Sequence, residues 1–289
     1  MTMKSSINVL IYSYKGRSLK DNVLTLSKNL SGKHEVGIGI IDQHPLDRRD
    51  FFEKELGFGY RHIFWDFITN PNSYFYSNTK NSTADYFLLL SDNIVLPKNW
   101  DEELIKSYTK STVLSGQGGT KLKAKNLFYL DKEIIDTNEI TKTNFINRDF
   151  IFASREVMIS INFPDYIKYN GVEEILSVDL FTKGVDIYSM PSNFYSYSGP
   201  RTIETLYVPF SINHNYNEAI DLLQTGKNKF HSIINRDKTV KDFADYHNFD
   251  FNLLNKLPFS TNDVDYDPEK LNFNKVDARR YVATTKAIH

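Results

Sequence analysis

The sequence predicts an α/β fold in which helices flank a mainly parallel sheet. Two observations lead to this prediction. Short apolar or β-branched runs alternate with segments of helical periodicity over residues 1–110, and polar residues follow each run. The run at 86–90 is apolar throughout, as expected for a strand that is buried on both faces. In such sheets ligands bind beyond the carboxyl ends of the strands, so functional residues are expected there.

The elements of this half follow in order along the chain. Four predicted strands each end in polar residues: 7–12, 36–41, 62–67 and 86–90. A predicted helix follows each of them: 19–30, 46–56, 73–81 and 100–108. Pro45 is placed to begin the second helix, and Asn99 is placed to cap the fourth.

The rest of the chain is less regular. Residues 116–147 are expected to form loops and small strands; helices follow at 155–161 and 172–181, and a strand at 185–190. We therefore expect a catalytic domain over residues 1–205, with a nucleotide-binding half (1–110) and an acceptor half (111–205). Residues 206–289 are expected to form a mostly helical extension.

Composition excludes several classes of protein. No apolar run approaches the roughly 20 residues that a membrane-spanning helix needs, and the first residues lack the apolar stretch of a signal peptide. A soluble cytoplasmic protein without a membrane partner is therefore expected. The absence of cysteine excludes disulfides and thiolate chemistry, so any metal must bind oxygen or imidazole ligands. The net charge of −1 gives no overall attraction to nucleic acid.

The polar tripeptide after the fourth strand, Ser91-Asp92-Asn93, is the strongest candidate for chemistry. A carboxylate and an amide oxygen at a strand end can hold a divalent cation, Mn²⁺ or Mg²⁺, that bridges the two phosphates of a nucleotide-sugar. The cation would neutralise the departing diphosphate. The alternative is structural, because Asp and Asn after a strand are common turn formers and helix caps.

Polar and aromatic residues also follow the first two strands. An aromatic ring can stack on a nucleobase and an arginine can bind phosphate, while polar side chains can read the base or ribose. The candidates for binding the nucleotide are Tyr12, Ser13, Tyr14, Arg17, Asp42 and Gln43. The alternative is that they are ordinary loop residues. Neither a P-loop nor a dinucleotide fingerprint is present.

Several segments together resemble a family of GT-A-type glycosyltransferases, the GlcNAc-transferase family that includes the cytoplasmic hydroxyproline GlcNAc-transferases. Residues 85–101 resemble the hydrophobic strand, Asp-Ser-His metal motif and Trp-Asp pair of that family. Three further regions agree in order with its first strand, its second strand, and its Gly-Glu-Glu helix with the strand that follows: 9–15, 36–43 and 171–191. The resemblance covers about residues 7–191.

The resemblance implies a GT-A-like fold, a UDP-sugar donor, a divalent metal and retention of configuration at the anomeric carbon. It implies roles for residues of this chain. Asp92 and Asn93 would bind the metal, with His214 as a distant substitute for the late histidine of the family. Ser91 stands where the family has its first carboxylate, and Lys80 where it has an arginine.

Glu173 and Glu174 would lie at the start of a helix that faces the sugar and the acceptor, as catalytic carboxylates. One of the two is expected to point inward, since adjacent helical residues lie about 100° apart. The alternative is that both simply suit the positive end of the helix dipole.

Two classes of acceptor follow. The resemblance implies a protein or glycan hydroxyl. A composition rich in Asn, Lys, Ile, Tyr and Phe is typical of a phage or low-GC genome, and basic segments at 121–125 and 227–241, with Arg279 and Arg280, are compatible with duplex DNA that carries hydroxymethylated bases. A non-catalytic module that binds a nucleotide-sugar or a glycan is the alternative to an enzyme.

Overall fold

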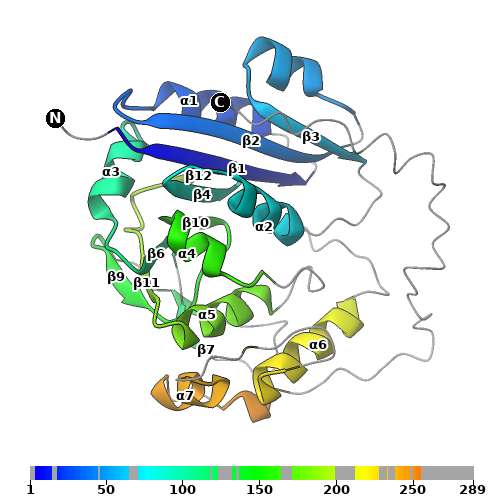
Figure 1. Cartoon of the computed structure of the whole chain (residues 1–289), viewed down its shortest axis with the longest axis vertical. Helices are drawn as coiled ribbons and strands as arrows, with labels where there is room; N and C mark the ends of the chain where they lie inside the picture. Colours follow the sequence, from blue (N-terminus) through cyan, green and yellow to red (C-terminus); the bar gives the residue numbers. More distant parts are fainter. Residues whose placement is uncertain are drawn as a thin grey trace.

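A computed structural model of the chain describes residues 4–14, 18–44, 46–64, 71–117, 119–122, 132–134, 137–163, 171–198, 212–227, 233, 238–247 and 250–254. Within these residues the largest sheet has eight strands in the order β3-β2-β1-β4-β10-β6-β11-β9 (Figure 1). Its strands are β1 (Ser6–Tyr14), β2 (Glu35–His44), β3 (Gly59–Phe64), β4 (Tyr86–Ser91), β6 (Thr112–Ser115), β9 (Thr141–Thr143), β10 (Phe150–Ser154) and β11 (Asp186–Ser189).

The predicted α/β fold with a mainly parallel, helix-flanked sheet is confirmed. Strands β3, β2, β1 and β4 are parallel, and β10 is antiparallel to both β4 and β6. Strand β11 is parallel to β6, and β9 is antiparallel to β11. The sheet continues across residue 110, the predicted limit of the nucleotide-binding half. Strands β1, β2, β4 and β6 therefore end at one edge of the sheet, and β10 begins there.

Two pairs of short strands lie outside this sheet. Strand β5 (Ile94–Val95) pairs with β12 (Ser196–Tyr197), and β7 (Gly119–Leu122) pairs with β8 (Lys132–Ile134). The described helices are α1 (Leu19–Lys28), α2 (Pro71–Asn81), α3 (Trp100–Ser107), α4 (Arg155–Ser160), α5 (Val172–Thr182), α6 (Ile212–Thr225), α7 (Val240–Tyr246), the π-helix η1 (Asp50–Glu55) and the 3₁₀ helix η3 (Phe251–Leu253).

The two faces of the sheet carry separate hydrophobic cores because side chains alternate along each strand. On β1, Val9 and Ile11 pack with α1, η1 and α3, whereas Leu10 packs with α2, α4 and α5. Figure 1 shows α1 and α2 on opposite sides of the sheet. Full burial of each such aliphatic side chain contributes roughly 1.5–3 kcal/mol. These packed layers fix the strand ends that carry the candidate site.

The helices after residue 205 share the second of these cores. Leu222 of α6 and Phe243 of α7 are buried in the same cluster as Ile175 of α5. The predicted boundary at 205 itself lies outside the described residues. Within the described part of the chain, no helix is both long enough and apolar enough to cross a bilayer.

Several local predictions need correction. The helix expected over 46–56 is only the π-helix η1, because the main chain before it bonds to side chains: Arg49 N–H donates to Asp47 Oδ1 at 2.9 Å. Asn99 precedes α3 but caps it through its carbonyl, without a side-chain bond, and its φ is 60°. Strand β3 begins at Gly59 rather than at residue 62; residues 65–67 lie outside the described residues.

Strands β6 and β10 were not predicted. Both consist of four or five residues and lie in the interior of the sheet. Gly116, which follows β6, has a packing role: a Cβ at this position would lie 2.8 Å from the hydroxyl oxygen of Tyr195. That hydroxyl accepts a hydrogen bond from Gln117 N–H at 2.8 Å. The close approach therefore holds the strand end in place.

Candidate functional site

The parallel register brings the predicted polar residues together at one edge of the sheet. Tyr12 on β1 lies beside Ser91 on β4, and Ser13 lies beside Asp42 on β2. Alternation then sends Ser13 and Asp42 toward the α1 side of the sheet and Tyr12 toward the α2 side. The edge therefore has two polar groups of residues, one on each face.

Asp92 occupies the centre of the group on the α1 side. Its carboxylate accepts a hydrogen bond from the Ser13 hydroxyl at 2.6 Å, and its main-chain carbonyl accepts one from the Asn22 side-chain amide, also at 2.6 Å. Asp92 thus joins the end of β4 to the end of β1 and to helix α1. Among the described residues it has no ion pair.

The ionised form of Asp92 is disfavoured in this environment. Burial raises the pKa of Asp92 from 3.8 to about 6; the Ser13 hydrogen bond and the positive charge of Arg48 oppose this rise, and the negative charges of Asp42 and Asp149 add to it. A carboxyl group with a raised pKa in a polar cluster is a frequent property of functional sites.

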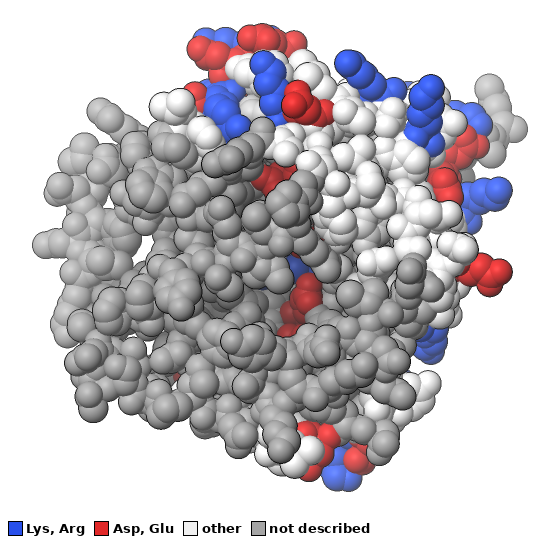
Figure 2. Space-filling model, turned by 180° about the vertical axis from the view of Figure 1, so that it is seen from behind, with Lys and Arg blue, Asp and Glu red and all other residues white. Residues whose placement is uncertain are grey.

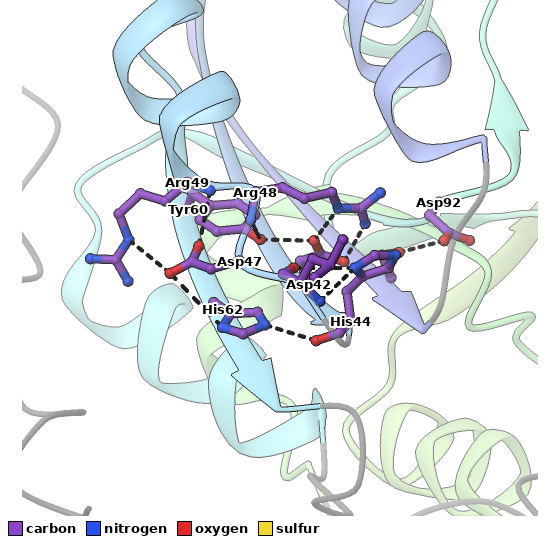
Figure 3. A network of polar contacts seen from close by, with 10 residues as sticks. Asp42, His44, Asp47, Arg48, Arg49, Tyr60, His62 and Asp92 are labelled. Carbon is purple, nitrogen blue, oxygen red and sulfur yellow. Dashed lines mark hydrogen bonds and ion pairs between the residues drawn. The ribbon is translucent and has the colours of Figure 1, made fainter.

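Asp42 is fully buried and has a different environment. Arg48 Nε and Nη2 donate to its two oxygens at 2.7 and 2.6 Å, and the Tyr60 hydroxyl donates to Oδ2 at 2.8 Å (Figure 3). Burial and then the charge of Asp42 raise the pKa of Tyr60 above its ordinary value, which keeps the phenol protonated as a donor. Both carboxylate oxygens of Asp42 thus accept hydrogen bonds from within the protein, and direct contact of Asp42 with the base or ribose stays a prediction.

On the other face, the Tyr12 hydroxyl donates to Gln43 Oε1 at 2.7 Å. Gln43 is only 1% exposed, whereas Tyr12 is half-buried. The two residues predicted to contact the nucleoside therefore act as one unit, in which Gln43 orients the ring of Tyr12.

Asp149 lies at the candidate site, although the sequence did not predict it there. It directly precedes β10, and the Ser91 hydroxyl donates to its Oδ1 at 2.8 Å, while Ser91 N–H donates to its carbonyl at 2.8 Å. Because β10 is antiparallel, its first residue pairs with Leu90 at the end of β4. The signal was the apolar run at 150–153, which would have identified β10 and thereby the position of Asp149.

Arg48 was also missed, although it is the cation nearest to Asp42. The sequence placed it inside a predicted helix, where its side chain had no assigned direction. Its salt bridge with Asp42 spans only six residues, but it forms because residues 46–49 turn back over the end of β2. Figure 3 shows the guanidinium of Arg48 between the labelled residues Asp42 and Asp92.

The two glutamates at the start of α5 differ in burial, as expected for one inward-facing member. Glu174 is 3% exposed, whereas Glu173 is half-buried. Glu173 Oε1 accepts a hydrogen bond from Arg148 N–H at 2.9 Å, one residue before Asp149. The start of α5 is therefore linked to the same edge of the sheet as Asp92.

The side chains of three predicted residues fall outside the described part of the structure, and a fourth residue, Lys80, lies away from this edge. Arg17 and the side chains of Tyr14 and His214 lie outside the described residues, although Tyr14 is in β1 and His214 is in α6. Lys80 is exposed in the last turn of α2, and β4 begins five residues after α2 ends, at the edge opposite Asp92. Its predicted role as a phosphate-binding cation therefore needs correction.

The described residues contain no group of three or more His, Asp or Glu arranged to hold a metal. Asp92 and Asn93 nevertheless fit a divalent cation in part. Asn93 Oδ1 is buried and has no hydrogen-bond partner among the described residues, and the neighbouring Asp92 supplies a desolvated carboxylate. Both groups are oxygen ligands of the kind that Mg²⁺ and Mn²⁺ prefer.

A surface hollow of about 450 Å³ lies at the edge of the sheet opposite to Asp92. Its lining includes Tyr86, Tyr108 and Arg155 but none of the predicted site residues. Arg155 donates from Nε to the carbonyl of Ser82 at 2.9 Å. The volume of a hollow alone therefore does not identify the functional site.

Comparison with known proteins supports the fold. The sequence matches no protein-family model and no curated protein. The structure is similar to S. aureus TarS (TM-score 0.50, 12% identity, covering 78% of this chain and 41% of that chain). It is also similar to GalNAc-T7 in a structure with UDP, GalNAc and Mn²⁺ (TM-score 0.57, 11% identity, covering 87% and 56%).

The matched part therefore covers 41% of TarS and 56% of GalNAc-T7, which is about half of each protein. At such identities the similarity is one of fold. The eight-stranded, mainly parallel sheet with helices on both faces is the GT-A fold of glycosyltransferases.

Proposed function

We propose that this protein is a glycosyltransferase that moves a sugar from a nucleotide-sugar, a UDP-sugar, to a hydroxyl acceptor, with a divalent cation at Asp92. One observation carries the proposal: a desolvated carboxylate without an ion pair among the described residues lies where β1 and β4 end together in a GT-A fold. Ligands of open α/β sheets bind at this edge.

The electrostatics of Asp92 favour binding of a cation. Burial and the negative charges of Asp42 and Asp149 disfavour the ionised form of this carboxylate more than Arg48 and the Ser13 hydrogen bond favour it, so a further positive charge would stabilise it. Asp92 and the amide oxygen of Asn93 would hold Mn²⁺ or Mg²⁺. When bound, the cation would supply a positive charge for the diphosphate that leaves.

The nucleoside would bind on the other face, against Tyr12. Its half-buried ring can stack on uracil, and its hydroxyl is fixed by Gln43. The Mn²⁺ and UDP in the GalNAc-T7 structure support a UDP-sugar and a divalent cation for this chain as well. Ser13 would act indirectly, by fixing the direction of the Asp92 carboxylate.

The start of α5 would contact the sugar and the acceptor. In the transfer step the acceptor oxygen bonds to the anomeric carbon and the bond from that carbon to the diphosphate oxygen breaks. The acceptor proton passes to a base, for which the buried Glu174 is the candidate. Glu173 is a positioning residue, because its Oε1 holds the main chain at Arg148.

Both acceptor classes remain proposals: a hydroxymethylated base in duplex DNA, and a protein or glycan hydroxyl. The basic segments at 121–125 and 227–241 fall mostly outside the described residues, and Arg279 and Arg280 fall wholly outside them. Over the described part of the face in Figure 2, Lys and Arg alternate with Asp and Glu without a patch of one sign. A cytoplasmic location is likewise proposed from the sequence alone.

The proposed donor can be tested on the purified protein by a thermal-shift screen of nucleotide-sugars with and without Mn²⁺. A ligand at about 100 times its Kd stabilises the native state by roughly 2.7 kcal/mol, which is roughly 5–10 °C in Tm. We expect UDP-sugars to give such a shift only with Mn²⁺, and Asp92→Asn to abolish it.

Asp101→Asn is the matched control for this screen, because Asp101 is also buried and accepts a hydrogen bond from a serine hydroxyl, Ser31, at 2.6 Å. It should lower Tm but keep the ligand-induced shift. Binding without any hydrolysis or transfer of the sugar would favour the alternative of a non-catalytic nucleotide-sugar or glycan-binding module.

The raised pKa of Asp92 predicts that ionisation of this residue lowers the stability of the metal-free protein as the pH rises. A carboxyl group with a folded pKa of about 6 against 3.8 contributes its full share of stability below about pH 4 and loses it as pH rises through 6. Metal-free Asp92→Asn should therefore be more stable than wild type by up to roughly 3 kcal/mol at pH 8. Chemical denaturation at pH 4 and pH 8 measures this; equal or lower stability of the variant at pH 8 contradicts it.

The roles proposed for Glu173 and Glu174 can be tested by comparing the donor turnover of two isosteric variants, Glu173→Gln and Glu174→Gln. Because an amide oxygen can still accept from Arg148 N–H, Glu173→Gln should change kcat by less than about fivefold. Glu174→Gln removes the proposed base and should lower kcat by roughly 10²–10⁴. Glu156→Gln, in the first turn of α4, controls for loss of a helix-dipole interaction. Wild-type rates for Glu173→Gln and Glu174→Gln would remove both from the site.

If duplex DNA is the acceptor, the affinity of the protein for DNA should depend strongly on the salt concentration. If the basic segments contact 6–10 phosphates, affinity for duplex DNA should fall by roughly 10³–10⁵ between 50 and 200 mM salt. Fluorescence anisotropy with labelled duplex measures this slope. A flat salt dependence, together with sugar transfer to a protein or glycan, would assign the acceptor to the second class.

A further inference from the structure

Asn22 lies on α1 in the first helical turn after Ser18 and is 7% exposed. Its Nδ2 donates both of its protons: one to the carbonyl of Asp92 at 2.6 Å and one to the Ser198 hydroxyl at 2.8 Å. Asn22 and Asp92 also line one small cavity between α1 and the ends of β1 and β4. A single side chain thus connects three separate parts of the chain at the candidate site.

Ser198 holds the other half of the same turn. It follows β12, and its main-chain N–H donates to the carbonyl of Asn93 at 2.9 Å, with its hydroxyl 3.3 Å from the same oxygen. The pairing of β12 with β5 keeps this contact in register. The carbonyls of Asp92 and Asn93, which follow one another in the chain, are therefore held by Asn22 and Ser198 respectively.

We propose that Asn22 is a positioning residue of the donor site, which orients the turn at Asp92 and Asn93 so that both side-chain oxygens face one cation. The inference rests on the function proposed above. Ser13 fixes the carboxylate of Asp92 from one side, and Asn22 fixes its main chain from the other. With both ends held, the carboxylate has little rotational freedom left.

The chemistry requires a side chain with two donors. Both groups that Asn22 contacts are oxygens, one a carbonyl and one a hydroxyl, so the amide NH₂ matches them. An aspartate at this position has the same shape but only acceptor oxygens when ionised, and it would face the Asp92 carbonyl without a proton between them. Asn22→Asp is therefore the informative change.

The chain offers a matched control. Asn29, at the end of the same helix, donates from Nδ2 to the carbonyl of Leu96 at 2.7 Å. This contact also spans from α1 to the segment after β4, but it does not reach the site. Asn29→Asp therefore changes the same group in the same way, without touching the turn at Asp92.

The experiment measures the Mn²⁺ concentration that gives half of the UDP-dependent thermal shift, together with KM and kcat for donor hydrolysis. Loss of a residue that orients a metal ligand typically weakens metal affinity by 10–100-fold. We expect Asn22→Asp to raise the half-saturating Mn²⁺ concentration by at least about tenfold. It should also raise KM for the donor by a larger factor than it lowers kcat. Asn29→Asp should leave the Mn²⁺ dependence unchanged.

Ser198→Ala provides a second variant that should fold, because Ser198 is exposed. It removes one acceptor of Asn22 but leaves the bond from Asn22 to the Asp92 carbonyl, so it should raise the half-saturating Mn²⁺ concentration by less than the roughly tenfold expected for Asn22→Asp. Equal Mn²⁺ dependence of wild type, Asn22→Asp and Ser198→Ala would overturn the inference. Loss of the shift in Asp92→Asn would then still support the proposed function, whereas an unchanged shift in Asp92→Asn would contradict the function itself.

Discussion

The hydrogen bond between the Ser13 hydroxyl and the Asp92 carboxylate is the contact on which the candidate site depends. It forms only because β1 and β4 pair in the register that places Tyr12 beside Ser91. A shift of one residue would turn Ser13 to the other face of the sheet and leave Asp92 facing a different neighbour. The two hydrophobic cores, which fix that register, therefore also fix the position of the carboxylate.

Two buried carboxylates at this edge, Asp42 and Asp92, have different partners, and the difference indicates different roles. Asp42 is neutralised by Arg48 and accepts a third hydrogen bond from Tyr60, which makes it part of the scaffold. Asp92 receives one hydroxyl and, among the described residues, no ion pair. Breaking a paired buried charge costs stability, while an unpaired one is stabilised by a ligand of opposite charge. The difference explains why Asp92, rather than Asp42, is assigned to the cation.

Much of the fold and part of the site could be predicted from local patterns. The alternation of apolar runs with helical periodicity places β1, β2 and β4 within a few residues, and the rule for parallel sheets then brings Ser13 and Asp92 to one edge. Asp149 and Arg48 were not found this way. Asp149 reaches the site through an antiparallel strand whose only local signal is the short apolar run at 150–153. Arg48 reaches it through a turn stabilised by side-chain contacts, which leaves no periodic signal.

The central claim is that a cation binds at the carboxylate of Asp92 and meets the diphosphate of the donor. Anomalous diffraction from crystals grown with UDP and Mn²⁺ tests it most directly. We predict a manganese peak within about 2.0–2.6 Å of an Asp92 oxygen, the range of oxygen ligands to divalent cations, with a phosphate oxygen in the same coordination shell. Well-ordered UDP at this edge without manganese near Asp92, or manganese bound elsewhere, would contradict the account.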